Sequence, residues 1–183
     1  MNDDSLTRLA VPVNDDDHVR GPADAPVTLV EYGDFECPFC GVAYAAIKEF
    51  ERRYPAALRV VFRNFPLAMH PHAQSAAEAA EFAADGGRFW EMHDMLYEHQ
   101  RQLDVPHLLH YARDLGLDAA ALDEALRSQT YRPIVEESKE GGEESEIPGT
   151  PALFLNGVLF EEDPTVENLA HAVEWILEHG GTA

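Results

Sequence analysis

Short apolar runs and one helical period divide the first third of the chain into three predicted elements. A β-branched, apolar run over 27–33 predicts a buried strand. Apolar residues then recur at helical spacing from 38 to 53, where Tyr54-Pro55 ends the pattern. A second apolar run over 58–64 predicts another strand. The sequence therefore predicts a strand–helix–strand unit at this end.

The middle of the chain, residues 72–144, is rich in alanine and follows a helical period. Within this block, helices are predicted at 73–84, 89–100, 106–115 and 119–129. Gly86-Gly87 and Gly116 are predicted breaks, and Asp118 is a predicted cap. The highly charged stretch 136–146, with two glycines inside it, predicts an exposed and frayed return to the sheet.

The last quarter of the chain predicts a β-hairpin followed by a helix. Strands are predicted at 152–156 and 158–161, joined through Asn156-Gly157, a dipeptide that favours hairpin turns. A helix is predicted at 165–179. At 183 residues the chain suits a single α/β domain, 18–183, with a helical insertion at about 70–145 between the second and third core strands.

Residues 1–17 are rich in aspartate: Asp3, Asp4, Asp15, Asp16 and Asp17 lie among them. They have neither the basic start nor the apolar core of a secretory signal, and they predict a disordered acidic leader. No apolar stretch of the chain reaches the length of a transmembrane helix. A cytoplasmic location is expected if the chain begins at its native start, whereas a trimmed N-terminus would leave a periplasmic or secreted location open.

The charge balance of the chain disfavours two classes of partner. Asp and Glu number 34 against 13 Lys and Arg, which gives a formal net charge of −21. Such a balance disfavours binding to nucleic acids and attraction to anionic membranes. Only Lys48 and Lys139 are lysines, and an acidic, lysine-poor surface suits a high-salt cytoplasm. Compositional drift towards arginine and alanine explains the balance equally well.

Both cysteines of the chain lie in one tetrapeptide, Cys37-Pro38-Phe39-Cys40. A bridge over so short a loop removes little entropy from the unfolded chain, so redox exchange or metal binding explains the pair better than stapling. Cys37 falls between a predicted strand and a predicted helix, and Pro38 suits the first helical position. Unpaired N–H groups and the helix dipole there favour a thiolate. Cys37 is thus the predicted nucleophile, and Cys40 the resolving thiol.

A second motif, Gly149-Thr150-Pro151, lies far from the cysteines in the sequence and opens a predicted strand. Together with Cys37-Pro38-Phe39-Cys40, the segments that carry a resemblance are Ala25-Pro26-Val27-Thr28-Leu29-Val30-Glu31-Tyr32, Phe35-Glu36 and Phe62-Arg63-Asn64-Phe65-Pro66-Leu67. Over roughly residues 18–178, the chain resembles the thioredoxin superfamily, and more closely its DsbA-like branch.

This resemblance implies a thioredoxin fold, βαβ…ββα, with a helical insertion. It also implies that Cys37 attacks, that Cys40 resolves and that the Thr150–Pro151 peptide bond is cis. In the family this bond presents backbone groups to an extended substrate peptide. Thr150, Pro151, Phe39 and Pro38 are therefore the expected substrate-binding residues.

Glu31 is the third candidate catalytic residue. It lies six residues before Cys37, in an apolar strand where a carboxylate is costly to bury. The resemblance implies a buried acid at this offset, beneath Cys40. Burial would raise its pKa and let it exchange a proton with Cys40. The alternatives are an exposed glutamate at the strand end, or a carboxylate paired with an arginine such as Arg63.

Phe39 sets the expected chemistry of Cys37, because its side chain cannot donate a hydrogen bond to a thiolate. DsbA-like proteins with histidine between the cysteines gain such a bond and are strong oxidants. We therefore expect the pKa of Cys37 to lie between the ~8.5 of free cysteine and the ~3.5 of the most oxidising members. Six apolar residues are candidates for a collar that grips peptides or, alternatively, for core: Phe35, Phe39, Phe65, Pro66, Leu67 and Met69.

Histidines offer a metal hypothesis that the sequence supports poorly. His70 and His72, or His107 and His110, could supply ligand pairs, but no second CxxC completes a zinc site. No metal and no cofactor are predicted beyond a redox-active Cys37–Cys40 disulfide. Either His70 or His72 could instead tune Cys37 electrostatically, and the sequence does not choose between them.

The favoured function is thiol-disulfide exchange with protein substrates, through a mixed disulfide on Cys37. The expected partners are protein thiols and disulfides, together with a redox partner that recycles the pair. A glutathione-linked transferase or isomerase on a related fold is one alternative, which Cys40 argues against. A non-catalytic module that binds peptides or senses redox state is the other. The direction of exchange is not written in the sequence.

Overall fold

A mixed, five-stranded sheet forms the centre of the computed structural model, which describes residues 6–180. The strand order is β1-β3-β2-β4-β5. The strands β2 (Val27–Gly33) and β3 (Leu58–Asn64) are parallel and are joined by α1 (Pro38–Arg53). β4 (Ala152–Leu155) pairs antiparallel with β2, and β5 (Val158–Phe160) pairs antiparallel with β4. This order agrees with the predicted strand–helix–strand unit and hairpin.

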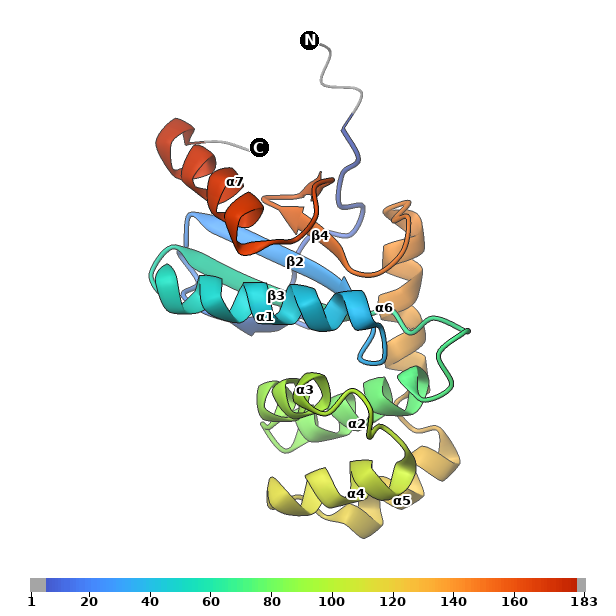
Figure 1. Cartoon of the computed structure of the whole chain (residues 1–183). Coiled ribbons are helices and arrows are strands. Elements are labelled where there is room, and N and C mark those ends of the chain that lie inside the picture. The colour runs from blue at the N-terminus through green and yellow to red at the C-terminus, as the bar shows by residue number, and fades with distance from the viewer. Residues whose placement is uncertain (1–5, 181–183) are drawn as a thin grey trace.

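Helices cover both faces of the sheet. On one face, α1 and α7 (Val166–His179) pack over a core that includes Leu29, Val60 and Leu155 (Figure 1). The other face carries a second cluster around Tyr32 and Phe154. No helix in the described part of the chain combines the length and the apolar character needed to span a bilayer.

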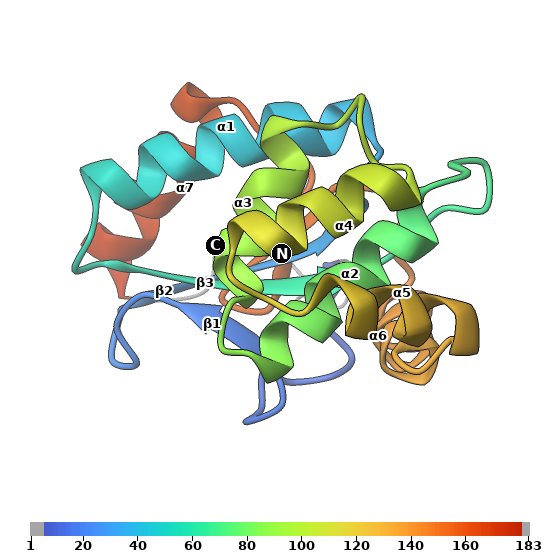
Figure 2. The same ribbon diagram turned by 90° about the horizontal axis from the view of Figure 1, so that it is seen from below.

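Five helices form the insertion between β3 and β4. They are α2 (Ala73–Asp85), α3 (Phe89–Glu98), α4 (Val105–Asp114), α5 (Ala119–Ser128) and α6 (Arg132–Glu144). Figures 1 and 2 show α2 to α5 gathered beside the sheet, while α6 leads back to it. The core of the insertion is continuous with Phe35, Cys37, Cys40 and Phe62, so the insertion buries the cysteine pair from one side.

The prediction that residues 136–146 form an exposed, frayed return to the sheet is wrong, because α6 spans most of this stretch. The two glycines do not break this helix. A Cβ at Gly142 would lie 2.6 Å from the Phe65 ring, so glycine allows α6 to approach the sheet closely. Ser145 is also buried and donates a hydrogen bond to the Gly141 carbonyl oxygen. The charged residues lie on the outward side of a packed helix.

The prediction of a disordered leader is wrong for residues 6–17, whereas residues 1–5 lie outside the described part. The Leu9 N–H donates to Gly157, and Arg8 forms an antiparallel bridge with Val158, so this segment runs beside β5. Leu9 and Val13 pack against the core on that face. A short strand that the sequence did not predict, β1 (His18–Arg20), then pairs antiparallel with β3.

Arg63 holds this N-terminal segment to the sheet. Its guanidinium forms a bidentate pair with Asp17 at 2.7 and 2.8 Å, and both side chains are 7% exposed. It also donates to the carbonyl oxygens of Val11 and Pro12. Asp17, one of the aspartates that suggest disorder by composition, is therefore neutralised by a residue distant in the sequence.

Replacing Arg63 tests this anchor. Arg63→Met leaves the Asp17 carboxylate buried without its partner, so we expect the free energy of unfolding to fall by about 3–5 kcal/mol. Urea denaturation measures the change. Arg52→Met is the matched control, because its pair with Glu49 is exposed to solvent and its loss should change stability little. A loss in Arg63→Met no larger than in the control would contradict this role.

Candidate active site

The two cysteines occupy different positions on α1. Cys37 is the N-cap residue, with extended backbone, and Pro38 opens the helix as predicted. Cys40 lies inside the first turn and is fully buried (0% exposed). Both sulfurs are free thiols in this structure. Cys37 thus lies at the N-terminal end of α1, and Cys40 lies within the helix.

Local hydrogen bonds favour the thiolate of Cys37. The bond from the Cys40 thiol contributes most, and the N–H groups of Cys40 and Phe39 add to it against an opposing effect of burial. Together they lower the pKa of Cys37 to about 5. This value lies within the range expected from the sequence, and it makes Cys37 the charged sulfur at neutral pH.

Cys40 is the opposite case. Burial chiefly raises the pKa of its thiol, and the hydrogen bond to Cys37 and the nearby Glu31 carboxyl raise it further. Only the Asp34 N–H, 3.5 Å from Cys40 Sγ, acts in the other direction. Cys40 therefore keeps its proton unless a base removes it.

Glu31 acts electrostatically on Cys40 and is the candidate for such a base. It is 2% exposed and lies in β2. Burial raises the pKa of its carboxyl to about 8, against the lowering effect of Arg20. The alternative pairing with Arg63 does not occur. Arg63 is in register with Tyr32 and donates to its hydroxyl, so it lies on the other face of the sheet.

Tyr97, from α3 of the insertion, lies next to this acid without having been predicted. A Cβ at Gly33 would meet its hydroxyl at 2.7 Å, and residues 31 and 33 share one face of β2. Within the described residues, neither the Tyr97 hydroxyl nor Glu31 Oε1 has a hydrogen-bond partner. Burial and the neighbouring Glu31 raise the pKa of Tyr97, so its hydroxyl keeps its proton.

The Thr150–Pro151 segment lies against Cys37. Its peptide bond is cis, and Pro151 directly precedes β4. Cys37 Sγ lies 3.5 Å from the Thr150 carbonyl oxygen. The structure thus brings residues 113 positions apart into contact, as the resemblance implied.

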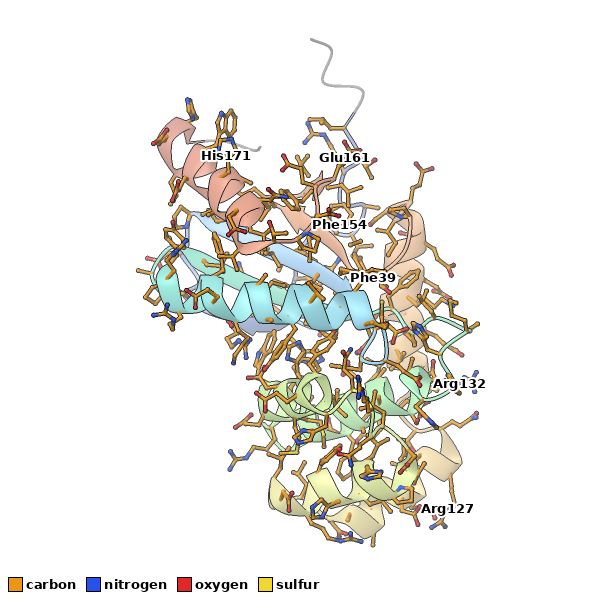
Figure 3. The ribbon with its side chains drawn as sticks, viewed as in Figure 1. Phe39, Arg127, Arg132, Phe154, Glu161 and His171 are labelled. Atoms are coloured by element: carbon orange, nitrogen blue, oxygen red, sulfur yellow. The ribbon has the colours of Figure 1, made fainter. Side chains whose placement is uncertain are left out.

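Only part of the candidate collar surrounds the site. Phe39 is 72% exposed and Met69 is 78% exposed, and Pro38 is exposed as well. Figure 3 shows Phe39 at the start of α1. Phe35 and Phe65 are buried, so for them the alternative of core packing holds. Pro66 is buried and Leu67 is half-buried.

Two polar residues that the sequence did not single out hold the active-site loop. The buried Asp34 carboxylate accepts the N–H groups of Glu36 and Leu67, both at 2.8 Å. Gln100, just after α3, donates to the carbonyl oxygens of Phe35 and Cys37 at 2.9 and 2.8 Å. Their partners lie up to 65 residues away, so no local pattern reveals them. The insertion thereby fixes the backbone that carries Cys37.

Among residues 6–180, no group of three or more His, Cys, Asp or Glu side chains is placed to hold a metal ion. His107 lies 2.7 Å from Asp104 and His110 lies 3.3 Å from Asp114, which are pairs within α4 and its cap.

Comparison with known proteins identifies the family. A family model described as "Thioredoxin" matches residues 13–175. BdbD from Bacillus subtilis is 25% identical, with 87% of this chain and 92% of that chain covered and a TM-score of 0.79. A thioredoxin-like oxidoreductase from Silicibacter pomeroyi is also 25% identical, with coverage of 97% and 99% and a TM-score of 0.79.

The fold extends to more distant structures. Wolbachia pipientis alpha-DsbA1 is 16% identical, with 93% of this chain and 94% of that chain covered and a TM-score of 0.80. The chain belongs to the thioredoxin family and has the fold of the DsbA-like thiol-disulfide oxidoreductases. The predicted family and the predicted fold class, with its helical insertion, are confirmed.

Curated relatives carry a different name. Na(+)/H(+) antiporter NhaA 1 of Salinispora arenicola is 46% identical over 172 residues, which are 93% of this chain and 26% of that protein. NhaA 3 of Salinispora tropica is 45% identical with the same coverage. The chain spans about a quarter of the length of these relatives.

The protonation of Glu31 can be tested through stability. Because its folded carboxyl has a pKa of about 8 against an ordinary 4.5, the folded protein keeps a proton there that the unfolded chain releases between these pH values. The free energy of unfolding therefore falls as pH rises through this window, by at most about 1.4 kcal/mol per pH unit. Glu31→Gln should remove that fall and be the more stable protein at pH 8 in urea denaturation. Parallel pH profiles for the two proteins would contradict the assignment.

Proposed function

We propose that this chain is a thiol-disulfide oxidoreductase that exchanges disulfides with protein substrates. The observation that carries the proposal is the contrast between the two sulfurs: the pKa of Cys37 is lowered to about 5, while burial raises that of Cys40. A thiolate is the nucleophile of disulfide exchange, and a protonated neighbour is kept for the second step. The similar structure from Silicibacter pomeroyi, a thioredoxin-like oxidoreductase, supports the same class of reaction.

In the first step, the Cys37 thiolate attacks one sulfur of a substrate disulfide. A bond forms between Cys37 Sγ and that sulfur, and the other substrate sulfur leaves as a thiolate. The chain and its substrate are then joined by a mixed disulfide. Cys37 itself is 3% exposed, but it lies at the start of α1, directly before the exposed Pro38 and Phe39, where a substrate disulfide can approach.

In the second step, the Cys40 sulfur attacks Cys37 Sγ and releases the substrate as its thiolate. Glu31 takes the Cys40 proton as the attack begins when its carboxyl is ionised, and with a pKa of about 8 the ionised fraction is small at neutral pH and grows as the pH approaches 8. The dithiol becomes a disulfide, and two electrons pass to the substrate. Run backwards, the same steps oxidise a substrate dithiol. No bound cofactor is needed, since the cysteine pair carries the electrons.

The substrate is proposed to lie along the exposed surface at the start of α1. Pro38 and Phe39 would contact its apolar side chains, and the backbone at Thr150 and Pro151 would pair with its main chain. The exposure of Phe39 and the 3.5 Å distance from Cys37 Sγ to the Thr150 carbonyl oxygen support this position. If the chain acts in the cytoplasm, where thiols are held reduced, exchange would run towards substrate reduction.

The glutathione-linked alternative and the passive-binder alternative remain less favoured. Both leave unexplained why Cys40 is held beside Cys37 with an acid at the same site. Antiport, the activity in the names of the curated relatives, is said of proteins about four times as long.

Trapping the mixed disulfide tests the proposal. In Cys40→Ala the second step is blocked, so incubation with insulin as a disulfide substrate should leave a covalent adduct on Cys37 that a reductant releases. Electrophoresis without reductant and mass spectrometry detect it. The matched control, the double variant Cys37→Ala/Cys40→Ala, should form none. Absence of the adduct in the folded single variant would contradict exchange and favour a passive binder.

A further inference from the structure

Asp34 links both cysteines to the loop that follows β3. Its carbonyl oxygen accepts the Cys37 N–H at 3.1 Å, and its own N–H points at Cys40 Sγ at 3.5 Å. Its side chain is fully buried, and Oδ2 lies 2.7 Å from His70 Nδ1. A buried carboxylate needs a positive partner or several donors, and here His70 is the only basic side chain that the described residues place against it.

His70 is joined to the loop before α1 through its ring, which pairs with the Asp34 carboxylate. Its side chain is 18% exposed, and Asp34, Cys37 and Glu36 all act on it electrostatically. Burial lowers the pKa of His70, but Asp34, the Cys37 thiolate and Glu36 together raise it above its ordinary value. Electrostatic coupling is reciprocal, so an imidazolium that the thiolate stabilises must stabilise the thiolate equally.

We propose that His70, held in place by Asp34, is a positioning residue that sets the charge and reactivity of Cys37. Between the cysteines, Pro38 and Phe39 offer neither a charge nor a side-chain donor. The cation comes instead from the loop that follows β3, brought to the site by Asp34. This inference rests on the proposed function, because it concerns the same nucleophile.

His72 is the contrasting residue in the same loop. Its backbone N–H donates to Glu36 at 2.6 Å, so the loop is tied to the active site at this point as well. The Asp34 carboxylate, however, bonds to Glu36, Leu67 and His70 and not to His72. Of the two histidines that the sequence left open, the structure selects His70.

The experiment removes the charge and keeps the hydrogen bond. In His70→Asn the amide nitrogen stands near the position of Nδ1 and can still donate to Asp34, but it carries no charge. The Cys37 titration is followed in reduced protein by thiolate absorbance at 240 nm and by the rate of alkylation with iodoacetamide. We expect the pKa of Cys37 to rise by about 0.5–1 unit. His72→Asn is the matched control and should leave it unchanged.

The wild-type pH profile carries a second signature. The alkylation rate should rise as Cys37 ionises and change again at higher pH, as His70 loses its proton; the second inflection should be absent in His70→Asn. A merely structural latch would move neither the pKa of Cys37 nor this inflection. An unchanged titration in folded His70→Asn overturns the proposal.

A reciprocal measurement keeps the proposal testable if His70→Asn fails to fold. The pKa of His70, read from its ring-proton NMR signals in the otherwise native chain, should be lower in Cys37→Ala than in reduced wild type. An equal pKa in both proteins overturns the proposal. Failure of disulfide exchange in wild type, with the Cys37–His70 coupling intact, would count against the proposed function and not against this coupling.

Discussion

The start of α1 imposes different environments on two sulfur atoms that are separated by less than one helical turn. Cys37 caps the helix and faces free N–H groups, whereas Cys40 is enclosed and lacks comparable stabilisation. Charge on one sulfur is thereby favoured and charge on the other is penalised. Glu31 in β2, Asp34 directly after β2 and the Thr150–Pro151 segment before β4 are arranged around this difference.

The helical insertion maintains that difference. Its core encloses Cys40 and supplies the low-dielectric surroundings that keep its thiol protonated. Gln100 binds the backbone carbonyl of Cys37, and Tyr97 places its hydroxyl beside Glu31's face of β2. The loop between β3 and α2 adds His70 through Asp34. The sheet and α1 are enough to position the two cysteines. Their burial and charge, however, depend on residues of the insertion and of the loop that leads into it.

Local signals in the sequence were sufficient where structure depends on local rules. Pro38 after Cys37 predicted the helix start, and Asn156-Gly157 predicted the hairpin, where both residues do adopt positive φ. Prediction failed where the deciding partner is distant. The Arg63–Asp17 pair holds residues 6–17 to the sheet, and α6 packs closely against Phe65 because Gly142 has no side chain.

The candidate site shows the same division. Cys37 and Cys40 follow from a motif, while Asp34 and Gln100 act through contacts 33 to 65 residues away and leave no pattern in the chain. The buried, unpaired state of Glu31 was one of three open readings, because the sequence of the strand does not reveal which of its faces the insertion will cover. Phe35 and Phe65 were ambiguous for the same reason.

The most direct test of the account is the equilibrium of the Cys37–Cys40 pair with reduced and oxidised glutathione. A pKa of about 5 for Cys37 lies between those of thioredoxin (~7) and DsbA (~3.5). The account therefore predicts a reversible disulfide with a reduction potential between about −270 and −120 mV. A pair that forms no reversible disulfide, or one as reducing as thioredoxin or more so, would contradict it.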